Sequence, residues 1–419
     1  MKRFTVLLLI ATLAIGLFAE GYTLEQLIEE GMGNASSIRK SELNMDNANS
    51  SHNSSWLNFL PEAGVSYRKT ESKDGDSESG SLSVSKTIAL NEGDYFQFRG
   101  SEIDRSIAEI SFDSAKKNLV YSILEAYLNI LQTQKELEIQ QENLALQERM
   151  YNEISLQVNQ GRKTALDLNQ TEIDKIDSQI QIDNLTNTLI NLRADLFSML
   201  KLDDNGSEFT DVNIPITPPE NLPAPKELKP DNNDNPFNFK IDYLDLKKMK
   251  INEWQSKLNF LPTITVTASY GQGSVNDEVL EFKNYDESYS VQLNASYSLW
   301  NIFTHGEDYR RYKNSLKNAE IDLQDNIDEF YNQYNKYIRE LGYLHKTKSL
   351  YERKASQSAE NLAVANEKYT LGLIDLIELE RARISNLQAR ISLNQNYYSI
   401  LRSQEKLNQL LSAPIMNRW

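Results

Sequence analysis

The sequence predicts a mixed α and β fold in which one structural unit occurs twice, each unit combining two strands with long coiled-coil helices. Three observations carry this prediction: an internal repeat, two pairs of alternating segments, and apolar residues at a seven-residue spacing. The chain has 419 residues, a formal net charge of −16, three histidines and no cysteine. The charge disfavours nucleic-acid binding, and the missing cysteines exclude disulfides, thiolate metal sites and a Cys-linked lipid anchor. Neither an enzyme nor a cofactor is therefore expected.

The first residues have the layout of a secretory signal peptide. Met1–Ala19 contains two basic residues, an apolar run and a small residue before Glu20. This order is typical of a signal that is cleaved on export, and an uncut membrane anchor is the alternative. No later segment reaches the roughly 18 consecutive apolar residues of a transmembrane helix. We therefore expect an exported chain from which residues 1–19 have been removed.

The internal repeat divides the rest of the chain into two similar halves. The segment Leu-Asn-Phe-Leu-Pro ends at Pro61 and occurs again with its end at Pro262. Between the halves, a stretch with seven of the ten prolines cannot continue a helix and is expected to be irregular. The expected organisation is a signal peptide at 1–19, repeat 1 at 20–202, a Pro-rich linker at 203–236 and repeat 2 at 237–419.

Two alternating segments follow each Leu-Pro, and Pro61 and Pro262 are expected to stand directly before strands. Proline disfavours α geometry in the residue before it, so a helix should end at each Leu-Pro. The expected strands cover about 62–70, 80–91, 262–271 and 287–301. Apolar and small polar residues alternate along them, with Lys86 as the one break, which gives one apolar and one polar face. Their length and the aromatic residues at the end of the last strand favour membrane strands, and surface hairpins of a soluble domain are the alternative.

Long helices are expected at about 101–160, 164–202, 305–371 and 374–412, with a further helix before each Leu-Pro. A strict seven-residue spacing of apolar residues predicts left-handed coiled coils. In the first of these helices the spaced residues are Ile123, Ile130, Leu137, Leu144, Tyr151 and Val158. A helix of about 60 residues extends about 90 Å, much further than a membrane is thick.

The strands and helices together require an assembly of several chains. Four strands cannot close a barrel, and an open sheet edge is not tolerated in lipid. If the strands span a membrane, two chains would supply eight strands and three would supply twelve, and the sequence does not choose between them. The polar inner faces would then enclose a water-filled duct.

The signal peptide, the doubled Leu-Pro-strand-strand unit, the glycine-containing helix turns and the Pro-rich linker resemble the TolC family of outer-membrane efflux proteins. The resemblance covers essentially the whole mature chain. It implies a homotrimer with a twelve-stranded transmembrane β-barrel shared between three chains and a long, antiparallel α-helical coiled-coil barrel in the periplasm. It also implies an exit duct in the outer membrane of a diderm bacterium, for efflux of small molecules or secretion of proteins. The implied partners are outer-membrane lipid, a periplasmic adaptor protein, and an inner-membrane efflux pump or ABC exporter. The alternative is an exported periplasmic coiled-coil structural protein without a channel.

The resemblance further assigns residues to a periplasmic constriction. Gly161 and Gly372 mark the turns between the long helices, which form the narrow end in the family. A family pattern matches Tyr369 with Asp167 as a hydrogen-bonded latch and Glu378 with an acidic ring position. Three symmetry-related carboxylates around a narrow duct would concentrate cations.

Two residues of this constriction depart from the family pattern. Arg381 stands where a second acidic residue often occurs, and Ile374 stands where an arginine of the latch can be. An ion pair between Glu378 and Arg381, three residues apart on a helix, would neutralise the ring. Helix capping is the alternative reading of the same turns, with an acid in each first helical turn and a left-handed glycine closing each preceding helix, and both roles can hold at once.

Overall fold

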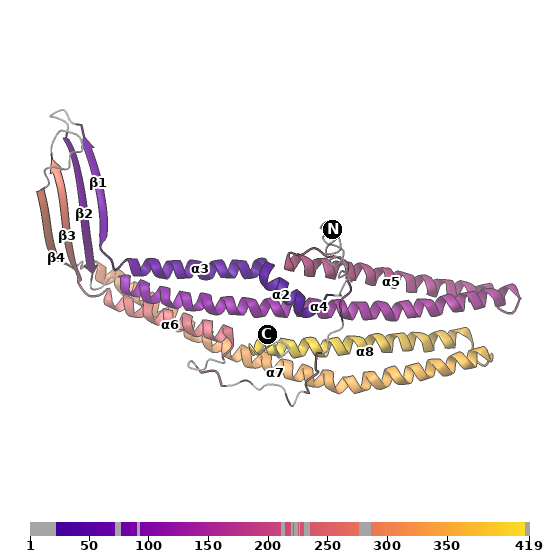
Figure 1. The fold of residues 1–419 in the computed structure, drawn as a ribbon. Helices are drawn as coiled ribbons and strands as arrows, with labels where there is room; N and C mark the ends of the chain where they lie inside the picture. The colour runs from indigo at the N-terminus through magenta and orange to yellow at the C-terminus, as the bar shows by residue number, and fades with distance from the viewer. Residues whose placement is uncertain are drawn as a thin grey trace, which may run out of the picture. The chain divides into compact units, whose positions relative to one another are not determined.

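The computed structural model describes residues 22–71, 77–89, 93–210, 214–218, 221, 225, 227–229, 235–275, 286–297 and 299–414. The signal peptide expected at 1–19 and parts of the linker expected at 203–236 lie outside these residues. The helices are α2 (Leu24–Asn34), α3 (Ser36–Leu57), α4 (Asp94–Asn159), α5 (Ala165–Leu200), α6 (Phe237–Leu258), α7 (Asn301–Thr370) and α8 (Leu376–Leu410). The strands are β1 (Glu62–Thr70), β2 (Ser77–Ala89), β3 (Thr263–Val275) and β4 (Asp286–Ser296), and Figure 1 labels these elements.

Several observed bounds differ from the expected ones. β4 ends at Ser296, whereas the sequence predicted a strand to about 301. The pair Thr263 with Ser296 is the last of the β3–β4 ladder, because β3 begins there, directly after Pro262. β3 in turn continues to Val275 instead of ending near 271. α4 begins at Asp94 and α7 at Asn301, so both helices start earlier than predicted.

The chain divides into two compact units, and neither coincides with a sequence repeat. Unit 1 comprises Met1–Lys40, Ser114–Glu227 and Phe330–Trp419. Unit 2 comprises Ser41–Asp113 and Leu228–Glu329. Each unit therefore takes segments from both halves of the sequence, because α4 and α7 begin in unit 2 and end in unit 1.

Unit 2 contains one antiparallel sheet with the strand order β1-β2-β3-β4. The β2–β3 ladder joins the two halves of the sequence in this sheet (Figure 1). The register places apolar residues opposite one another, so that Val84 pairs with Tyr270 and Tyr270 pairs with Tyr289. Lys86, the break in the predicted alternation, donates a hydrogen bond to the Asn58 carbonyl and lies 3.8 Å from the Asp94 carboxylate. Its ammonium thereby reaches polar partners beyond the end of the strand, which is the usual way in which lysine is accommodated on an apolar face.

The junctions between helix and strand are built alike in the two halves. β1 begins directly after Pro61 and β3 directly after Pro262, as expected. The preceding helices end at Leu57 and Leu258, which is earlier than the Leu-Pro where the sequence predicted their ends. Backbone bonds between residues three apart close both ends: Leu60 N–H donates to Leu57 O and Leu261 N–H donates to Leu258 O, each at 2.9 Å. Such a tightened last turn satisfies carbonyls that a helix end leaves open.

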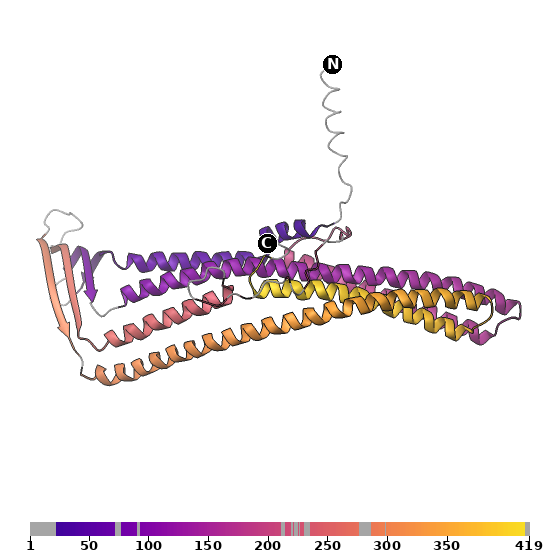
Figure 2. The ribbon, with the colours of Figure 1, turned by 90° about the horizontal axis from the view of Figure 1, so that it is seen from below.

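Unit 1 is built around the hairpin of α4 and α5, the hairpin of α7 and α8, and the short helix α2, and Figures 1 and 2 show α7 beside α8 in both views. One face of α2 is deeply buried, with Leu24, Leu27 and Ile28 at most 1% exposed. Gly31 allows this close packing, since a Cβ there would lie 2.7 Å from Leu200 Cδ2. On the α7–α8 hairpin, Leu341, Ile400 and Leu407 form a fully buried cluster, against which Tyr334, Tyr337, Ile338, Leu344, Leu411 and Ile216 pack.

The buried strip of α4 is wider and more polar than the predicted heptad seam. Ile123 and Ile130 are fully buried as predicted, whereas Leu137, Leu144, Tyr151 and Val158 are only half-buried. From Thr133 onward, the polar side chains Thr133, Gln140, Asn143 and Gln147 are buried in their place. The reason is that α4 contacts both α5 and α8, so two neighbouring faces are covered. Among the residues that the structure describes, no helix has an apolar stretch long enough to span a membrane.

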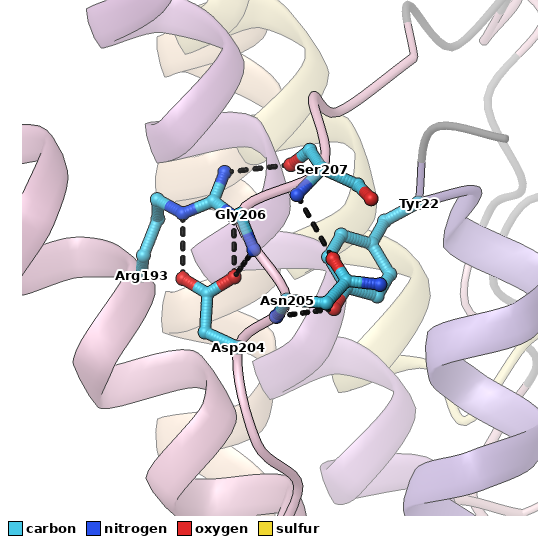
Figure 3. Close-up of polar contacts among 6 residues, drawn as sticks. All are labelled: Tyr22, Arg193, Asp204, Asn205, Gly206 and Ser207. Carbon is cyan, nitrogen blue, oxygen red and sulfur yellow. Dashed lines mark hydrogen bonds and ion pairs between the residues drawn. The ribbon is translucent and has the colours of Figure 1, made fainter. Parts of the chain in front are cut away.

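A clamp of side chains fixes the start of the described chain to the segment after α5 (Figure 3). The Arg193 guanidinium binds the Asp204 carboxylate through two hydrogen bonds and donates a third to the Ser207 carbonyl at 2.9 Å. The Tyr22 hydroxyl accepts a bond of 3.1 Å from Asn205 N–H. The Tyr22 ring also packs on Phe197 and Phe209, with centroids 5.0 and 5.5 Å away. The segment before α2 is thus held by its side chain as well as by its backbone bridge to Phe209.

Candidate functional site

The two hairpin turns of unit 1 have the same backbone geometry. Gly161 has φ +70° and Gly372 has φ +68°, in the left-handed region that favours glycine. After α4, Gly161 N–H donates to Val158 O and Arg162 N–H donates to Gln157 O, both at 2.9 Å. After α7, Gly372 N–H donates to Tyr369 O at 3.0 Å and Leu373 N–H donates to Lys368 O at 2.8 Å. This pair of bonds is the Schellman motif, which explains why both repeats place a glycine here.

Side-chain caps begin the helix after each turn. Thr164 is the N-cap of α5, and its hydroxyl oxygen accepts a bond of 3.2 Å from Asp167 N–H. The Asp167 carboxylate in return accepts from Thr164 N–H at 3.0 Å and from the Thr164 hydroxyl at 2.9 Å. These two bonds stabilise the ionised carboxylate and lower the pKa of Asp167 below its usual value. In the second turn, Asp375 caps α8 by accepting a bond of 2.8 Å from Glu378 N–H.

The structure does not contain the expected hydrogen bond between Tyr369 and Asp167. The Tyr369 hydroxyl is buried and has no hydrogen-bond partner among the residues that the structure describes. Burial raises the pKa of Tyr369, and the nearby carboxylates of Glu153, Asp167 and Glu380 add to this rise. Lys163 Nζ lies 5.3 Å from the centre of the Tyr369 ring. Within one chain, the Asp167 carboxylate instead accepts its hydrogen bonds from Thr164.

Glu378 and Arg381 are both exposed on the first turns of α8. No ion pair joins them in the described part of the chain, although their spacing of three residues would permit one. Ile374, at the position where the family latch can have an arginine, is half-buried. The exposed Glu378 carboxylate is therefore open to solvent in the single chain.

A buried ion pair that the sequence patterns did not predict lies on the opposite face of the same helix. Glu380 and Arg383 form an ion pair in which their side chains are only 9% and 8% exposed. Arg383 Nη1 also donates a bond of 2.7 Å to Asn143 Oδ1 on α4. The amide of Gln147, also on α4, faces the guanidinium, and its oxygen is the group that suits Arg383. We refer to Glu380, Arg383, Asn143 and Gln147 as the buried polar cluster.

Burial dominates the electrostatics of this cluster. Removal from water raises the pKa of Glu380 to about 7, an effect that Arg383 opposes and that the Asp174 carboxylate on α5 increases. Burial likewise lowers the pKa of Arg383, and Glu380 opposes that change. A pattern in the sequence could have predicted this cluster. The buried stripe of α8 runs, at helical spacing, through Leu376, Leu379, Glu380, Arg383 and Asn386. Charged residues inside such a stripe indicate a buried pair.

No group of three or more His, Cys, Asp or Glu side chains able to hold a metal occurs in the part of the chain that is described. The candidate site is thus made of hairpin turns, caps and one buried polar cluster, an arrangement suited to positioning helices.

Comparison with known proteins agrees with this architecture. The model of the family described as outer membrane efflux protein matches residues 27–200 and 254–413. The solved structure of CusC is 16% identical, with a TM-score of 0.79 over 93% of this chain and 92% of that one. The CmeC outer membrane channel of Campylobacter jejuni is 12% identical, with a TM-score of 0.78 over 94% and 87%. VceC, an outer membrane protein of Vibrio cholerae, is 13% identical, with a TM-score of 0.77 over 94% and 96%. No curated protein sequence matches the chain.

The two matched segments correspond to the two halves of the internal repeat and together cover well over half of the chain. They include both hairpin turns and all of α4, α5, α7 and α8. The fold that these three solved structures share extends over nearly the whole length of this chain. On this evidence, the chain belongs to the outer membrane efflux protein family.

Proposed function

We propose that this protein is an outer-membrane exit duct for efflux, in which three copies close one channel. The observation that carries the proposal is the exposed apolar face of the sheet. In the single chain, Val65, Tyr289, Val291 and Leu293 are 84%, 86%, 74% and 73% exposed. Large apolar side chains gathered in the open on one sheet mark a surface that meets lipid or another protein.

The sheet also has the edges that an assembly would close. β1 and β4 are its two edge strands. Edge strands present backbone groups to which a further strand can pair, and lipid does not tolerate them open. Three copies, each supplying four strands, would give the twelve-stranded barrel typical of the TolC family. The helices would continue this barrel as a tube in the periplasm.

The duct itself would be passive, with energy supplied by partners. Membership of an efflux family supports coupling to an inner-membrane efflux pump or ABC exporter through a periplasmic adaptor. Efflux of small molecules is the favoured use, and secretion of proteins through the same duct is the second one.

The constriction of this duct would lie at the hairpin turns of Gly161 and Gly372. Glu378 is its acidic ring position, and Arg381 lies one turn further along α8 on the exposed side. Asp167 and Tyr369 would contribute by fixing the helix start and by packing between the hairpins. Three Glu378 carboxylates around a narrow axis favour cations over anions.

The first test is the native mass of the mature protein after membrane fractionation, with and without detergent. An outer-membrane particle of three chains that requires detergent supports the proposal. A monomer or dimer that is soluble in water contradicts it and favours the structural coiled-coil protein, with the strands as surface hairpins.

A second test addresses the ring position by channel recordings in planar bilayers. Glu378→Ala and Glu378→Gln should both reduce the preference for cations, because the charge and not the shape of the side chain attracts them. Asp183→Asn, which neutralises an exposed acid in the middle of α5, is the matched control. Unchanged selectivity in both Glu378 variants would remove Glu378 from the constriction while leaving the duct itself in place.

A further inference from the structure

The buried polar cluster connects three helices of unit 1. From α8, Arg383 Nη1 donates to Asn143 Oδ1 on α4 at 2.7 Å. From α4, Asn143 Nδ2 donates to Ser178 Oγ on α5 at 3.0 Å. Ser178 Oγ in turn donates to the Asp174 carbonyl at 2.9 Å. One arginine thus ties the α7–α8 hairpin to the α4–α5 hairpin through a continuous chain of hydrogen bonds.

The cluster is sensitive to small displacements because it is buried and charged. Glu380 Oε2 receives both bonds from the guanidinium, and Glu380 Oε1 has no hydrogen-bond partner among the described residues. Removing one partner of a buried ion pair destabilises a structure strongly, because the other charge is left buried alone. The cluster therefore favours one well-defined arrangement, in which the two hairpins are packed together.

The contact between α8 and α4 at the cluster can also be separated. When apolar side chains move apart, they expose surface that water solvates poorly, whereas amides and ions exchange their hydrogen bonds for bonds to water. Near the cluster, polar side chains are buried on both sides: α4 supplies Gln140, Asn143 and Gln147, and α8 supplies Glu380 and Arg383. A helix interface of this composition can open in water at a lower cost than an apolar seam.

The position of the cluster relates it to the constriction. Residues two apart on an α-helix project about 200° apart around the axis. The exposed Glu378 and the buried Glu380 therefore lie on opposite faces of the same turn of α8. The contacts that hold the buried face of α8 in place therefore also fix the position of Glu378 on the opposite face.

We propose that Arg383 is a positioning residue of the duct, which holds the α7–α8 hairpin against α4 and so sets the aperture at the hairpin turns. This inference rests on the proposed channel function. The expected family latch at Tyr369 and Asp167 is not formed within the chain, and Arg383 supplies a cross-hairpin tie deeper in the helices.

The chain offers a closely matched control. Arg390 also lies on α8 and also pairs with α4, through Glu142 Oε2 at 2.7 Å. Its side chain and that of Glu142 are 37% and 51% exposed. Exposed ion pairs of this kind contribute little. Arg390→Ala therefore removes the same charge between the same helices without disturbing a buried contact.

The experiment compares full-length wild type, Arg383→Ala, Arg383→Lys, Asn143→Ala and Arg390→Ala, each purified in detergent and reconstituted in planar lipid bilayers. Arg383→Ala should raise the open fraction about tenfold, since loss of one partner of a buried pair shifts an equilibrium by at least that factor. Asn143→Ala should shift it in the same direction, and Arg383→Lys should be intermediate because lysine keeps the charge but not the fork. Arg390→Ala should match wild type.

The inference would be overturned if the open fraction of both Arg383→Ala and Asn143→Ala equalled that of Arg390→Ala. If Arg383→Ala does not assemble, Asn143→Ala decides alone, because it keeps the ion pair and removes the bonds of Asn143 to Arg383 on α8 and to Ser178 on α5.

A second readout does not require conduction. The chain has no cysteine, so Ala389→Cys introduces a single thiol at a fully buried position of α8. This thiol should react faster with maleimide in the double variant that also carries Arg383→Ala. It should react as slowly as in the single variant when Arg390→Ala is added instead. A wild type without any conductance contradicts the duct, whereas labelling that is unchanged by Arg383→Ala contradicts the tie itself.

Discussion

Tyr369 and Asp167 face the same hairpin end of unit 1, yet each is held without the other. The Asp167 carboxylate is bonded to Thr164, and the Tyr369 hydroxyl is buried without a hydrogen-bond partner in the described chain. Within one chain, the hydrogen bonds of Asp167 are therefore those of the α5 cap. This relationship makes the first turn of α5 a local stability element whose contribution can be measured directly.

Thr164→Ala should lower the stability of the protein by about 1 kcal/mol, the usual cost of losing a side-chain N-cap. Thr164→Ser should retain most of it, because serine keeps the capping hydroxyl. The pKa of Asp167 is lowered in the folded state. The contribution of Asp167 to stability is therefore present above its pKa in the unfolded chain, and it is lost as the pH falls through its pKa in the folded chain. Melting of the two variants in detergent at pH 7 and near pH 3 checks this. A similar loss for alanine and serine would exclude the cap as the cause.

Gly372→Ala should also destabilise, by about 1 kcal/mol, since an L side chain is strained at positive φ. A Cβ at this position meets no atom within 4 Å, so strain in the backbone is the only cost. Gly342, inside α7, has equally open surroundings and no positive φ. Gly342→Ala should therefore stabilise slightly through its better helix propensity. Opposite shifts in melting temperature are expected, and shifts of the same sign would show that the turn does not require glycine.

Much of the fold follows from local patterns that are visible in the sequence. The alternation predicted four strands, and the Schellman glycines and the capping residues predicted both hairpin turns. Proline correctly indicated where β1 and β3 begin, but the helices before them end earlier because a turn between residues three apart precedes the proline. Tyr297 extends the alternation of β4, yet it lies outside the strand because β3 has no further residue to pair with it.

The contacts within the candidate site were harder to predict from the sequence. Arg383 and Asn143 are 240 positions apart, and no repeat or motif relates them. The heptad count found the apolar part of the α4 seam, but it passed over Gln140 and Gln147, because a periodicity of apolar residues does not register polar side chains that are buried. Predicting the cluster requires knowing that α4 packs against two helices at once.

Tyr22 provides a test of the clamp at the start of the chain. Tyr22→Ala should cost about 3 kcal/mol, because it removes the packing of the ring on Phe197 and Phe209. Tyr22→Phe should cost about 1 kcal/mol, since it loses only the hydrogen bond from Asn205 N–H. Thermal unfolding in detergent ranks the two variants. An equal loss in both would mean that the hydroxyl, and not the ring, carries the clamp.

Glu380 should make the stability of the protein depend on pH in the neutral range. Its folded pKa of about 7 is raised above the ordinary glutamate value by burial, with the Arg383 guanidinium opposing and the Asp174 carboxylate adding to the rise. Tyr369 on α7 also faces this carboxylate, and it remains neutral throughout this range. A group with a raised pKa contributes stability that is fully present below its unfolded pKa and is lost as the pH rises through the folded value. The contribution of Glu380 should therefore decline between about pH 4.5 and pH 7.

The measurement compares wild type with Glu380→Gln, which cannot titrate, by melting in detergent from pH 5 to pH 8.5. The melting temperature of wild type minus that of the variant should be highest at pH 5 and should fall by a few degrees toward pH 8, roughly the change that one or two kcal/mol produces. Glu142→Gln, at an exposed acid on α4, should show a difference that does not change over this range. A difference that rises with pH would mean that Arg383 outweighs burial and holds the pKa of Glu380 low. In that case the ion pair would be fully formed at neutral pH, and the tie between the hairpins would weaken only in acid.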